Sequence, residues 1–340
     1  MVEGDWVDGR TVGESLDAMN SAHLAKGRLI FVRYPHYLGM VMCHGLGDGR
    51  VNVETLGVVA QMALTGEVVE WSPIPAAGPH LLSAAMRTFG PRPTLVREAL
   101  GDRYPLDIAM SSGASLPWSP SRRTIIETYE RSPAEKPADG TSKSGRRGSR
   151  FAITTCALLA ALRDAALPVS PDVNVMMDLR GYLGGRWIDG NFVAAVPMRI
   201  DADTSPKEFS ASLKKTKQTG RPLANQMLTS MRTGGRRRQV PAPTDTFDPQ
   251  HLPCLTLTDL GNSPLIDQLP FLDGQPVCYG ASGVPAGPHG VTIAFAHTPR
   301  ATSISVSFHD NVIDAAKVEH ALSVVTFDPP RVIDGRSVAR

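Results

Sequence analysis

Short runs of strand-forming residues alternate along the chain with segments whose apolar residues recur at helical spacing. Two apolar runs at 29–32 and 38–42 flank a Tyr-Pro-His turn, which predicts a hairpin. A glycine-rich turn, HGLGDG at 44–49, follows directly, and from residue 53 apolar residues are spaced as in a helix. The pattern predicts strand, turn and helix in that order.

The remaining pattern predicts further helices and strands on both sides of a polar segment at 132–150, which contains almost no residue able to enter a core. In chain order, the predicted elements are short helices at 81–87 and 95–100, a buried helix at 153–167, strands at 173–179 and 191–200, a helix at 206–218 with Ser205 as its N-cap, a strand at 254–264, a hairpin at 291–310 and a helix after Asp314. We therefore expect an α/β (α+β) fold with two lobes, at 1–131 and 151–340, and a crossing linker at 132–150.

Composition and charge exclude several classes of protein. The 340 residues include 35 Lys and Arg against 33 Asp and Glu, so a net charge of +2 gives no general attraction for nucleic acid or anionic membranes. The four cysteines have no metal-ligand spacing, which argues against a zinc site or a disulfide scaffold. The sequence shows neither a signal peptide nor a membrane-spanning segment. We expect a cytoplasmic protein that binds no metal.

His44 and Asp48, in the pattern H-x-x-x-D-G, are the first candidates for chemistry. A histidine on an exposed glycine turn is able to act as a general base towards a hydroxyl, amine or thiol. Asp48 would fix the turn by pairing with a distant cation, and Gly49 would supply an unusual backbone angle. In the alternative, structural interpretation, His44 caps a turn and Asp48 is the N-cap of the following helix.

The same segment imitates a dinucleotide-binding fingerprint, because Gly45 and Gly47 lie between a predicted strand and a predicted helix. Arg50 occupies the place of the third glycine, and no acidic residue ends a following strand. Hydride transfer is therefore the weaker hypothesis.

The segment 42–49, MCHGLGDG, resembles the active-site region of the CoA-dependent acyltransferase superfamily, which has the chloramphenicol acetyltransferase fold. Condensation domains, BAHD acyltransferases, wax ester synthases and polyketide-associated acyltransferases belong to this superfamily. Its signature is H-H-x-x-x-D-G. Here Cys43 stands at the first His, whereas His44, Asp48 and Gly49 match the signature.

Two later segments resemble further superfamily motifs in the expected order. MMDLRGYL at 176–183, followed by Gly190-Asn191, is similar to a strand ending in D-x-R and a later G-N. TDLGNSP at 258–264 is similar to the region that holds D-F-G-W-G or S-N-x-G, although it lacks the Trp. The resemblance covers about residues 28–325.

The resemblance implies acyl transfer from a thioester without a covalent acyl-enzyme. His44 would deprotonate a hydroxyl or amine acceptor, and acyl-CoA or acyl-phosphopantetheine on an acyl carrier protein would be the co-substrate. Asp48 would pair with Arg180 and so fix the His44 turn. The alternative for Arg180 is an exposed arginine at a strand end. A rival function is a non-catalytic, condensation-like module that binds a carrier protein.

Other candidates have both a functional and a structural interpretation. Asn191 and Asn262 would donate hydrogen bonds near the active-site tunnel, or they belong to ordinary turns. The basic runs 146–150 and 236–238 would meet CoA phosphates or an acidic carrier protein, or they are solvated loops. His297 and His309 are interpreted as structural.

The first lobe is shorter than the resemblance implies, since only 43 residues precede His44. A sheet with too few strands leaves an edge or an apolar face uncovered. We therefore expect a homo-oligomer in which residues 1–40 lie near the contact.

Overall fold

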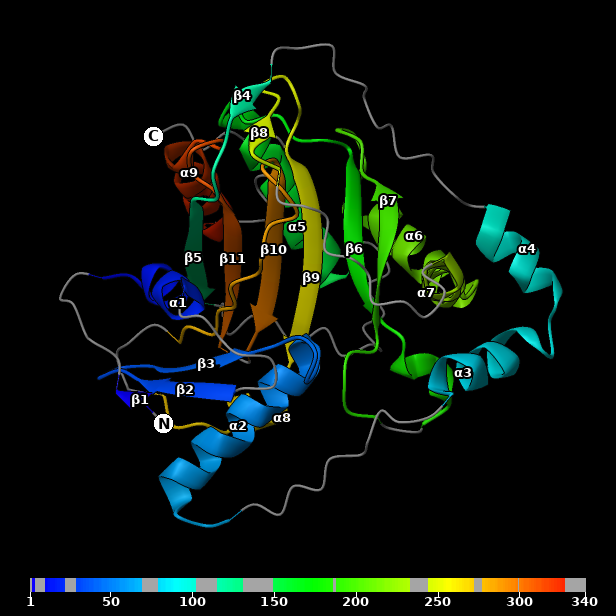
Figure 1. Cartoon of the computed structure of the whole chain (residues 1–340), viewed down its shortest axis with the longest axis horizontal. Helices are drawn as coiled ribbons and strands as arrows, with labels where there is room; N and C mark the ends of the chain where they lie inside the picture. Colours follow the sequence, from blue (N-terminus) through cyan, green and yellow to red (C-terminus); the bar gives the residue numbers. More distant parts are fainter. Residues whose placement is uncertain are drawn as a thin grey trace.

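A mixed six-stranded sheet forms the centre of the protein (Figure 1). The computed structural model describes residues 2–3, 10–21, 29–68, 79–101, 115–130, 149–185, 188–232, 244–271, 277–298 and 300–327. The strands lie in the order β5 (Arg122–Glu130), β11 (Ala301–His309), β10 (Gly290–His297), β9 (Cys254–Asn262), β6 (Asp172–Asp178) and β7 (Val193–Arg199). β9 pairs parallel with β10 and β6, and the other neighbours are antiparallel. The predicted α/β class is confirmed.

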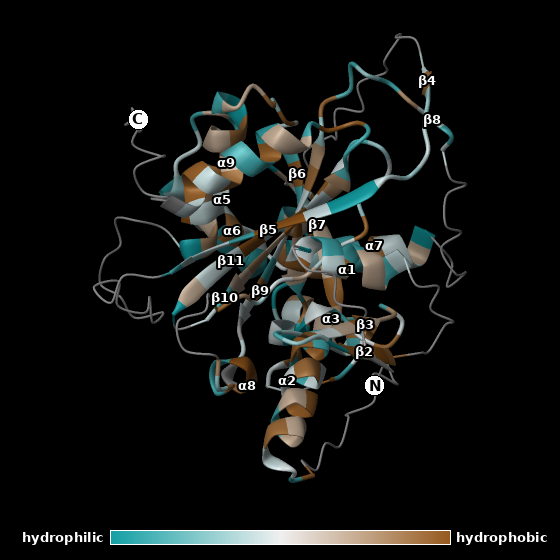
Figure 2. Cartoon of the chain, turned by 90° about the vertical axis from the view of Figure 1, so that its left-hand side faces the viewer, coloured by the Kyte–Doolittle hydropathy of each residue, from teal (hydrophilic) through white to brown (hydrophobic). Residues whose placement is uncertain are grey.

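One face of this sheet packs against helices and forms the main core. On β11 the apolar residues Ile304, Val306 and Phe308 alternate with serines, and all three are buried in the cluster that contains α5 (Arg150–Asp164) and α9 (Ala315–Phe327). Figure 2 shows α5, α9 and α6 (Pro206–Gln218) on the same side of the strands. α6 has the predicted N-cap, Ser205, within a complete capping box.

On the opposite face of the sheet, α1 (Val12–Ser21) packs against β5; the sequence pattern did not predict this helix. Thr124 on β5 donates from its Oγ1 to Asp17 at 2.7 Å, and Arg122 Nε lies 3.3 Å from Asp17. Gly13 lies so close to the Thr124 carbonyl that a side chain would collide with it. Absence of a Cβ at Gly13 therefore sets how closely α1 approaches the sheet.

A small sheet and a long helix lie below the main sheet in Figure 1. β1 (Val2–Glu3), β2 (Leu29–Arg33) and β3 (Leu38–Met42) form this sheet, and β2 and β3 are the predicted hairpin. The predicted helix is α2 (Gly49–Thr65), which contacts α8 (Pro264–Asp267).

Two further groups of elements complete the described part of the chain. The predicted short helices are α3 (His80–Phe89) and α4 (Thr94–Gly101). α3 packs against the short 3-10 helix η1 (Arg180–Leu183), and both α3 and α4 pack against α7 (Arg221–Arg232). The sequence pattern did not predict α7. A short pair, β4 (Leu116–Pro117) with β8 (Thr246–Phe247), lies at the top of Figure 1.

The division expected at 132–150 does not coincide with a division between sheets. β5 precedes this segment, yet it pairs along its whole length with β11, from Arg122 opposite His309 to Glu130 opposite Ala301. α3 and α4 also lie before it and pack on η1 and α7. Residues 131–148 themselves lie outside the described part, and α5 begins at Arg150.

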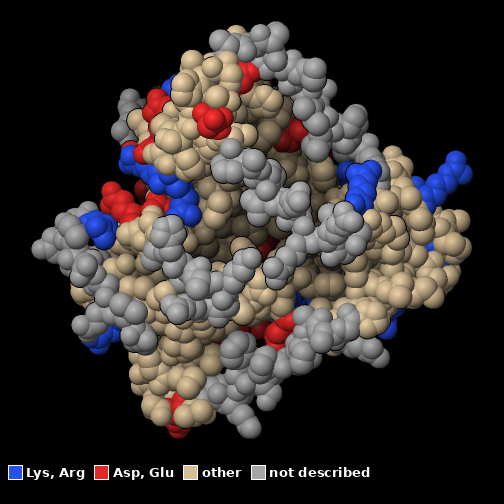
Figure 3. Space-filling model, in the orientation of Figure 1, with Lys and Arg blue, Asp and Glu red and all other residues tan. Residues whose placement is uncertain are grey.

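Surface charge agrees with the small net charge of the sequence. Figure 3 shows Lys and Arg side chains in several separate groups on the face that it displays, with acidic residues beside some of them. Within the described ranges, none of the helices has the length and apolar character that crossing a bilayer requires.

Candidate active site at the start of α2

His44 lies on the turn that joins β3 to α2. The turn closes with a hydrogen bond from the Leu46 N–H to the Cys43 carbonyl at 2.8 Å, and His44 is exposed on it. Gly47 has no room for a side chain, because an added Cβ would lie 2.6 Å from Val51. Close packing of the first helical turn therefore fixes the backbone that carries His44.

Asp48 is both the N-cap of α2 and one half of a buried ion pair. Its Oδ1 accepts from the Val51 N–H at 3.3 Å, as the structural interpretation expects. Its Oδ2 accepts from Arg180 Nη1 at 2.8 Å and from the Phe192 N–H at 3.0 Å. The expected pairing of Asp48 with Arg180 is thus present, and it coexists with the helix cap.

Arg180 is buried and uses its whole guanidinium group. The Arg180 side chain is 4% exposed and the Asp48 side chain 2% exposed. Nε donates to the Ile188 carbonyl and Nη2 to the Gly190 carbonyl, both at 2.8 Å, and Nη1 also reaches Asp178 at 3.0 Å. Arg180 therefore ties the end of β6 and the chain before β7 to the start of α2. It is not an exposed strand-end arginine.

The electrostatics of this cluster favour the charged guanidinium. Burial by itself lowers the pKa of Arg180, but the hydrogen bonds and negative charges of Asp48 and Asp178 outweigh it and raise that pKa above its ordinary value. Removing one partner would leave a buried charge uncompensated, which costs about 3–5 kcal/mol.

Gly49 has a different role from the one expected. It is the first residue of α2, and its φ is not among the positive values that seven other glycines in the described part adopt. The expectation of an unusual backbone angle is wrong. A Cβ at Gly49 would instead lie 3.0 Å from Leu260 Cδ2, so glycine allows α2 to approach β9 closely.

β9 has a bulge where α2 approaches it. The register with β10 shifts after the pair of Asp259 with Phe295, and Gly261 takes a left-handed φ of 67°. Asp259 Oδ1 accepts from the Gly261 N–H at 2.9 Å. The segment that resembled D-F-G-W-G therefore forms a bulge in the strand, where Gly261 adopts the left-handed conformation at no steric cost and Asp259 accepts from its N–H.

His297 on β10 lies next to this bulge. It is buried, with Nδ1 3.1 Å from Thr302 Oγ1 and Nε2 3.6 Å from Asp259 Oδ1. The sequence identified His297 as structural, and the contact with Thr302 agrees with that interpretation. What the sequence missed is that His297 and Asp259 also line a pocket.

This basic pocket has a volume of about 490 Å³. Besides Asp259 and His297, it is lined by Arg150 at the start of α5 and by Lys214 and Lys217 on α6. The lysines on the polar face of the predicted helix were visible in the sequence. Their position beside Asp259 depends on the packing of α6 against α5, which no local pattern reveals.

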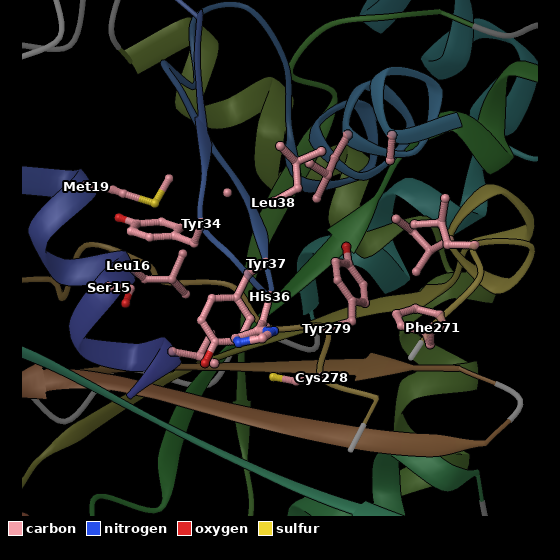
Figure 4. A pocket seen from close by; sticks show the side chains of 17 residues that line it. Ser15, Leu16, Met19, Tyr34, His36, Tyr37, Leu38, Phe271, Cys278 and Tyr279 are labelled. Carbon is pink, nitrogen blue, oxygen red and sulfur yellow. The ribbon is translucent and has the colours of Figure 1, made fainter. Parts of the chain in front are cut away.

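A second cavity, the apolar pocket, has a volume of about 400 Å³. It lies between α1, the turn between β2 and β3, α2, α8 and the segment 277–280. Figure 4 labels side chains from α1, from this turn and from the segment 277–280 around the cavity. Leucine, tyrosine and phenylalanine residues make up about half of the residues that line it. The sequence analysis did not identify it, because its walls come from five separate parts of the chain.

The remaining candidates are not brought together. Asn191 is exposed, and neither Asn191 nor His44 lines the basic or the apolar pocket. Asn262 ends β9 opposite His297, and its side chain lies outside the described part. Arg146, Arg147 and the run at 236–238 also lie outside it.

Metal and thiol chemistry have little support in the described residues. Across these ranges, no three His, Cys, Asp or Glu side chains are grouped so that they would hold a metal ion. All four cysteines are free thiols, and burial raises the pKa of Cys156 to about 11. Cys156 is therefore not a reactive thiolate at neutral pH.

Comparisons with known proteins show similarity of fold. No family model matches the chain, and no curated protein sequence is significantly similar to it. The epimerization domain from the third module of tyrocidine synthetase B superposes with a TM-score of 0.52 at 12% identity, covering 98% of this chain and 80% of that one. PapA2 acyl transferase superposes with a TM-score of 0.50 at 16% identity, covering 88% of this chain and 66% of that one. The chain therefore shares the mixed α/β fold of these peptide-synthetase and acyltransferase domains.

Proposed function

We propose that this protein is an acyltransferase that moves an acyl group from a CoA or carrier-protein thioester to a hydroxyl or amine. The observation that carries the proposal is the buried Asp48–Arg180 pair, because it holds the turn of the exposed His44 against the β6–β7 connection. A general base needs such a fixed geometry. The fold shared with PapA2 acyl transferase supports the same reaction class.

The proposed reaction uses His44 as a proton shuttle. The imidazole takes a proton from the acceptor O–H or N–H, and the oxygen or nitrogen forms a bond to the thioester carbonyl carbon. The tetrahedral oxyanion collapses, the C–S bond breaks, and the leaving thiolate takes the proton from the imidazolium. The products are an ester or amide and a free thiol, and no covalent acyl-enzyme forms.

The basic pocket supports a phosphate-bearing donor. Arg150, Lys214 and Lys217 lie together around it, and cations near the N-terminus of a 15-residue helix attract phosphate groups. Both CoA and phosphopantetheine carry phosphates, so this feature fits either donor. Self-association through residues 1–40 is also part of the proposal.

Substitution of His44 tests the mechanism. We expect His44→Ala to lower acyl transfer by about a hundredfold to ten-thousandfold, which is the usual contribution of a general base, with an unchanged melting temperature because His44 is exposed. Release of free thiol is measured over a panel of acyl-CoA and acyl-carrier thioesters with alcohol and amine acceptors.

The matched control is His320→Ala, which removes another exposed histidine, on α9. Its turnover should equal that of the unmodified protein. Equal turnover of His44→Ala and His320→Ala would remove His44 from the mechanism. Binding of a carrier protein without any thiol release from the panel would favour the non-catalytic module instead.

A further inference from the structure

The apolar pocket has the size of a small-molecule site. Its volume of about 400 Å³ falls within the range of roughly 300–1,000 Å³ that is usual for ligand pockets. An engineered cavity of about 150 Å³ in another protein binds benzene, so by scaling this pocket holds about fifteen non-hydrogen atoms. Leu16, Leu38, Leu56, Ile266 and Phe271 supply much of its wall.

Tyr279 places a hydroxyl group inside this apolar wall. The residue is 8% exposed, and Figure 4 shows its ring between Leu38 and Phe271, with the hydroxyl directed into the space that the labelled side chains surround. Within the ranges that the structure describes, this hydroxyl makes no hydrogen bond. The hydroxyl oxygen is not among the fully buried, unpaired polar atoms of the described residues, so it faces the open space of the pocket. A phenol in this position is able to donate a hydrogen bond to a ligand that carries an acceptor.

The rest of the chain holds Tyr279 firmly in this position. Serine hydroxyls on β11 accept from alternate backbone N–H groups of the neighbouring segment: Ser303 from Tyr279 at 3.3 Å, Ser305 from Ala281 at 3.2 Å and Ser307 from Gly283 at 3.2 Å. The Tyr279 ring also packs in a buried cluster with Val53, Ile266 and Ala296. The hydroxyl is therefore preorganised and does not turn away to find a partner elsewhere.

Burial also keeps Tyr279 in the form that donates a hydrogen bond. Loss of solvent raises the pKa of its phenol above the ordinary value, so the group stays protonated. Another hydroxyl in the wall, that of Ser15, already donates to the Thr11 carbonyl at 3.0 Å. Tyr279 thus offers a directed hydrogen bond to an otherwise apolar ligand.

We propose that the apolar pocket binds an apolar group of about fifteen non-hydrogen atoms that carries one hydrogen-bond acceptor, such as a carbonyl oxygen, and that Tyr279 donates to this acceptor. The inference rests on the proposed function in one respect: the group is part of the acyl or acceptor substrate.

Equilibrium binding of two matched probes tests the inference without any turnover. 2-Acetylnaphthalene and 2-isopropylnaphthalene have the same number of non-hydrogen atoms, and only the first carries an acceptor. By titration calorimetry, we expect the unmodified protein to bind the ketone about three- to tenfold more tightly, which is the effect of one net hydrogen bond. Tyr279→Phe should abolish this preference while it still binds the hydrocarbon.

Two further variants locate the effect. Tyr182→Phe removes a hydroxyl that donates to the Lys217 carbonyl at 2.7 Å outside the pocket, and it should keep the full preference for the ketone. Ala60→Leu narrows the pocket and should weaken both probes, with its melting curve verifying that it folds. Equal affinity of the two probes for the unmodified protein, or no binding of either, would overturn the inference.

The outcomes separate this inference from the proposed function. His44→Ala should bind both probes as the unmodified protein does, because His44 does not line the pocket. Ketone preference that depends on Tyr279, together with no acyl transfer over the whole panel, would contradict the acyltransferase and leave the binding site standing. Acyl transfer that depends on His44, with no ketone preference, would overturn this inference and leave the proposed function standing.

Discussion

Asp48 and Arg180 lie 132 positions apart in the sequence, yet each compensates the buried charge of the other. Each also has backbone partners, so both oxygens of the carboxylate and all three nitrogens of the guanidinium make hydrogen bonds. A buried pair of this kind contributes little net stability against an apolar alternative, but it makes one geometry strongly preferred. At this site the preferred geometry is that of the His44 turn.

Removing either charge should destabilise the fold strongly. We expect Asp48→Asn or Arg180→Met to lower the free energy of unfolding by about 3–5 kcal/mol, and the double variant to lose less than the sum, because no charge is then stranded. Urea unfolding measures all three. Asp178→Asn is the control: that side chain is 38% exposed, so its loss should cost less than about 1 kcal/mol. An Asp48→Asn cost no larger than the control's would contradict an organising role for the pair.

His309 should make stability depend on pH. Burial lowers the pKa of its imidazole, and its Nδ1 accepts from the Ser121 N–H at 3.2 Å, which requires the neutral ring. Because the unfolded state binds the proton more readily, this stabilisation is present in full above about pH 6.5 and is lost as the pH falls through the lower folded-state pKa. Unfolding free energy should therefore decrease on acidification across this range.

The variant His309→Asn should reduce that dependence, because its amide oxygen still accepts from Ser121 but does not titrate in this range. His289, whose pKa burial also lowers, would supply the part that remains. Urea unfolding at several pH values gives the slopes, and His320→Asn provides the control. An unchanged slope in His309→Asn would show that this imidazole has no part in the pH dependence.

Elements with local signals were predicted from the sequence, and those without such signals were missed. α6 has Ser205, Pro206 and Glu208 at the positions of an N-cap, a first helical residue and a capping-box acid, so its start is defined by neighbours in sequence. β5, with the sequence RRTIIETYE, has no turn signal of that strength and is a strand because β11 pairs with it, about 180 residues later. The strand conformation of β5 therefore depends on its pairing with β11 rather than on its local β-propensity alone.

β11 shows why the apolar pocket was not predicted. Its alternating sequence, ATSISVSFH, indicates a strand with one polar face, which is usually exposed. Here every residue of the strand is buried, and Ser303, Ser305 and Ser307 hold the segment that carries Tyr279. The alternation predicts the strand correctly, but its polar face is buried by the segment that carries Tyr279, which has no regular secondary structure. The Asp48–Arg180 pair, by contrast, was anticipated because a motif resemblance linked two distant segments.

At the scale of the whole molecule, the sequence before residue 132 and the sequence after residue 149 form one interlocked structure. β5 borders β11 in the main sheet, the start of α2 is tied to Arg180, and α3 packs on η1. Two lobes defined by position in the sequence would instead meet only at an interface. Because β5 and β11 share a continuous hydrogen-bonded ladder, we expect their folding to be coupled.

Division of the chain tests this coupling. The fragment 149–340 contains β11 but lacks β5, so the backbone groups of a fully buried strand would become an open edge. We expect the fragment to be insoluble or to lack a cooperative urea transition when expressed alone, and co-expression with fragment 1–130 to restore both solubility and cooperativity. A fragment 149–340 extended at its carboxyl end by a linker and a copy of 115–130 should recover more structure than one extended by the same sixteen residues in scrambled order. Cooperative unfolding of the fragment 149–340 by itself would show that β5 is dispensable and that the second lobe folds independently.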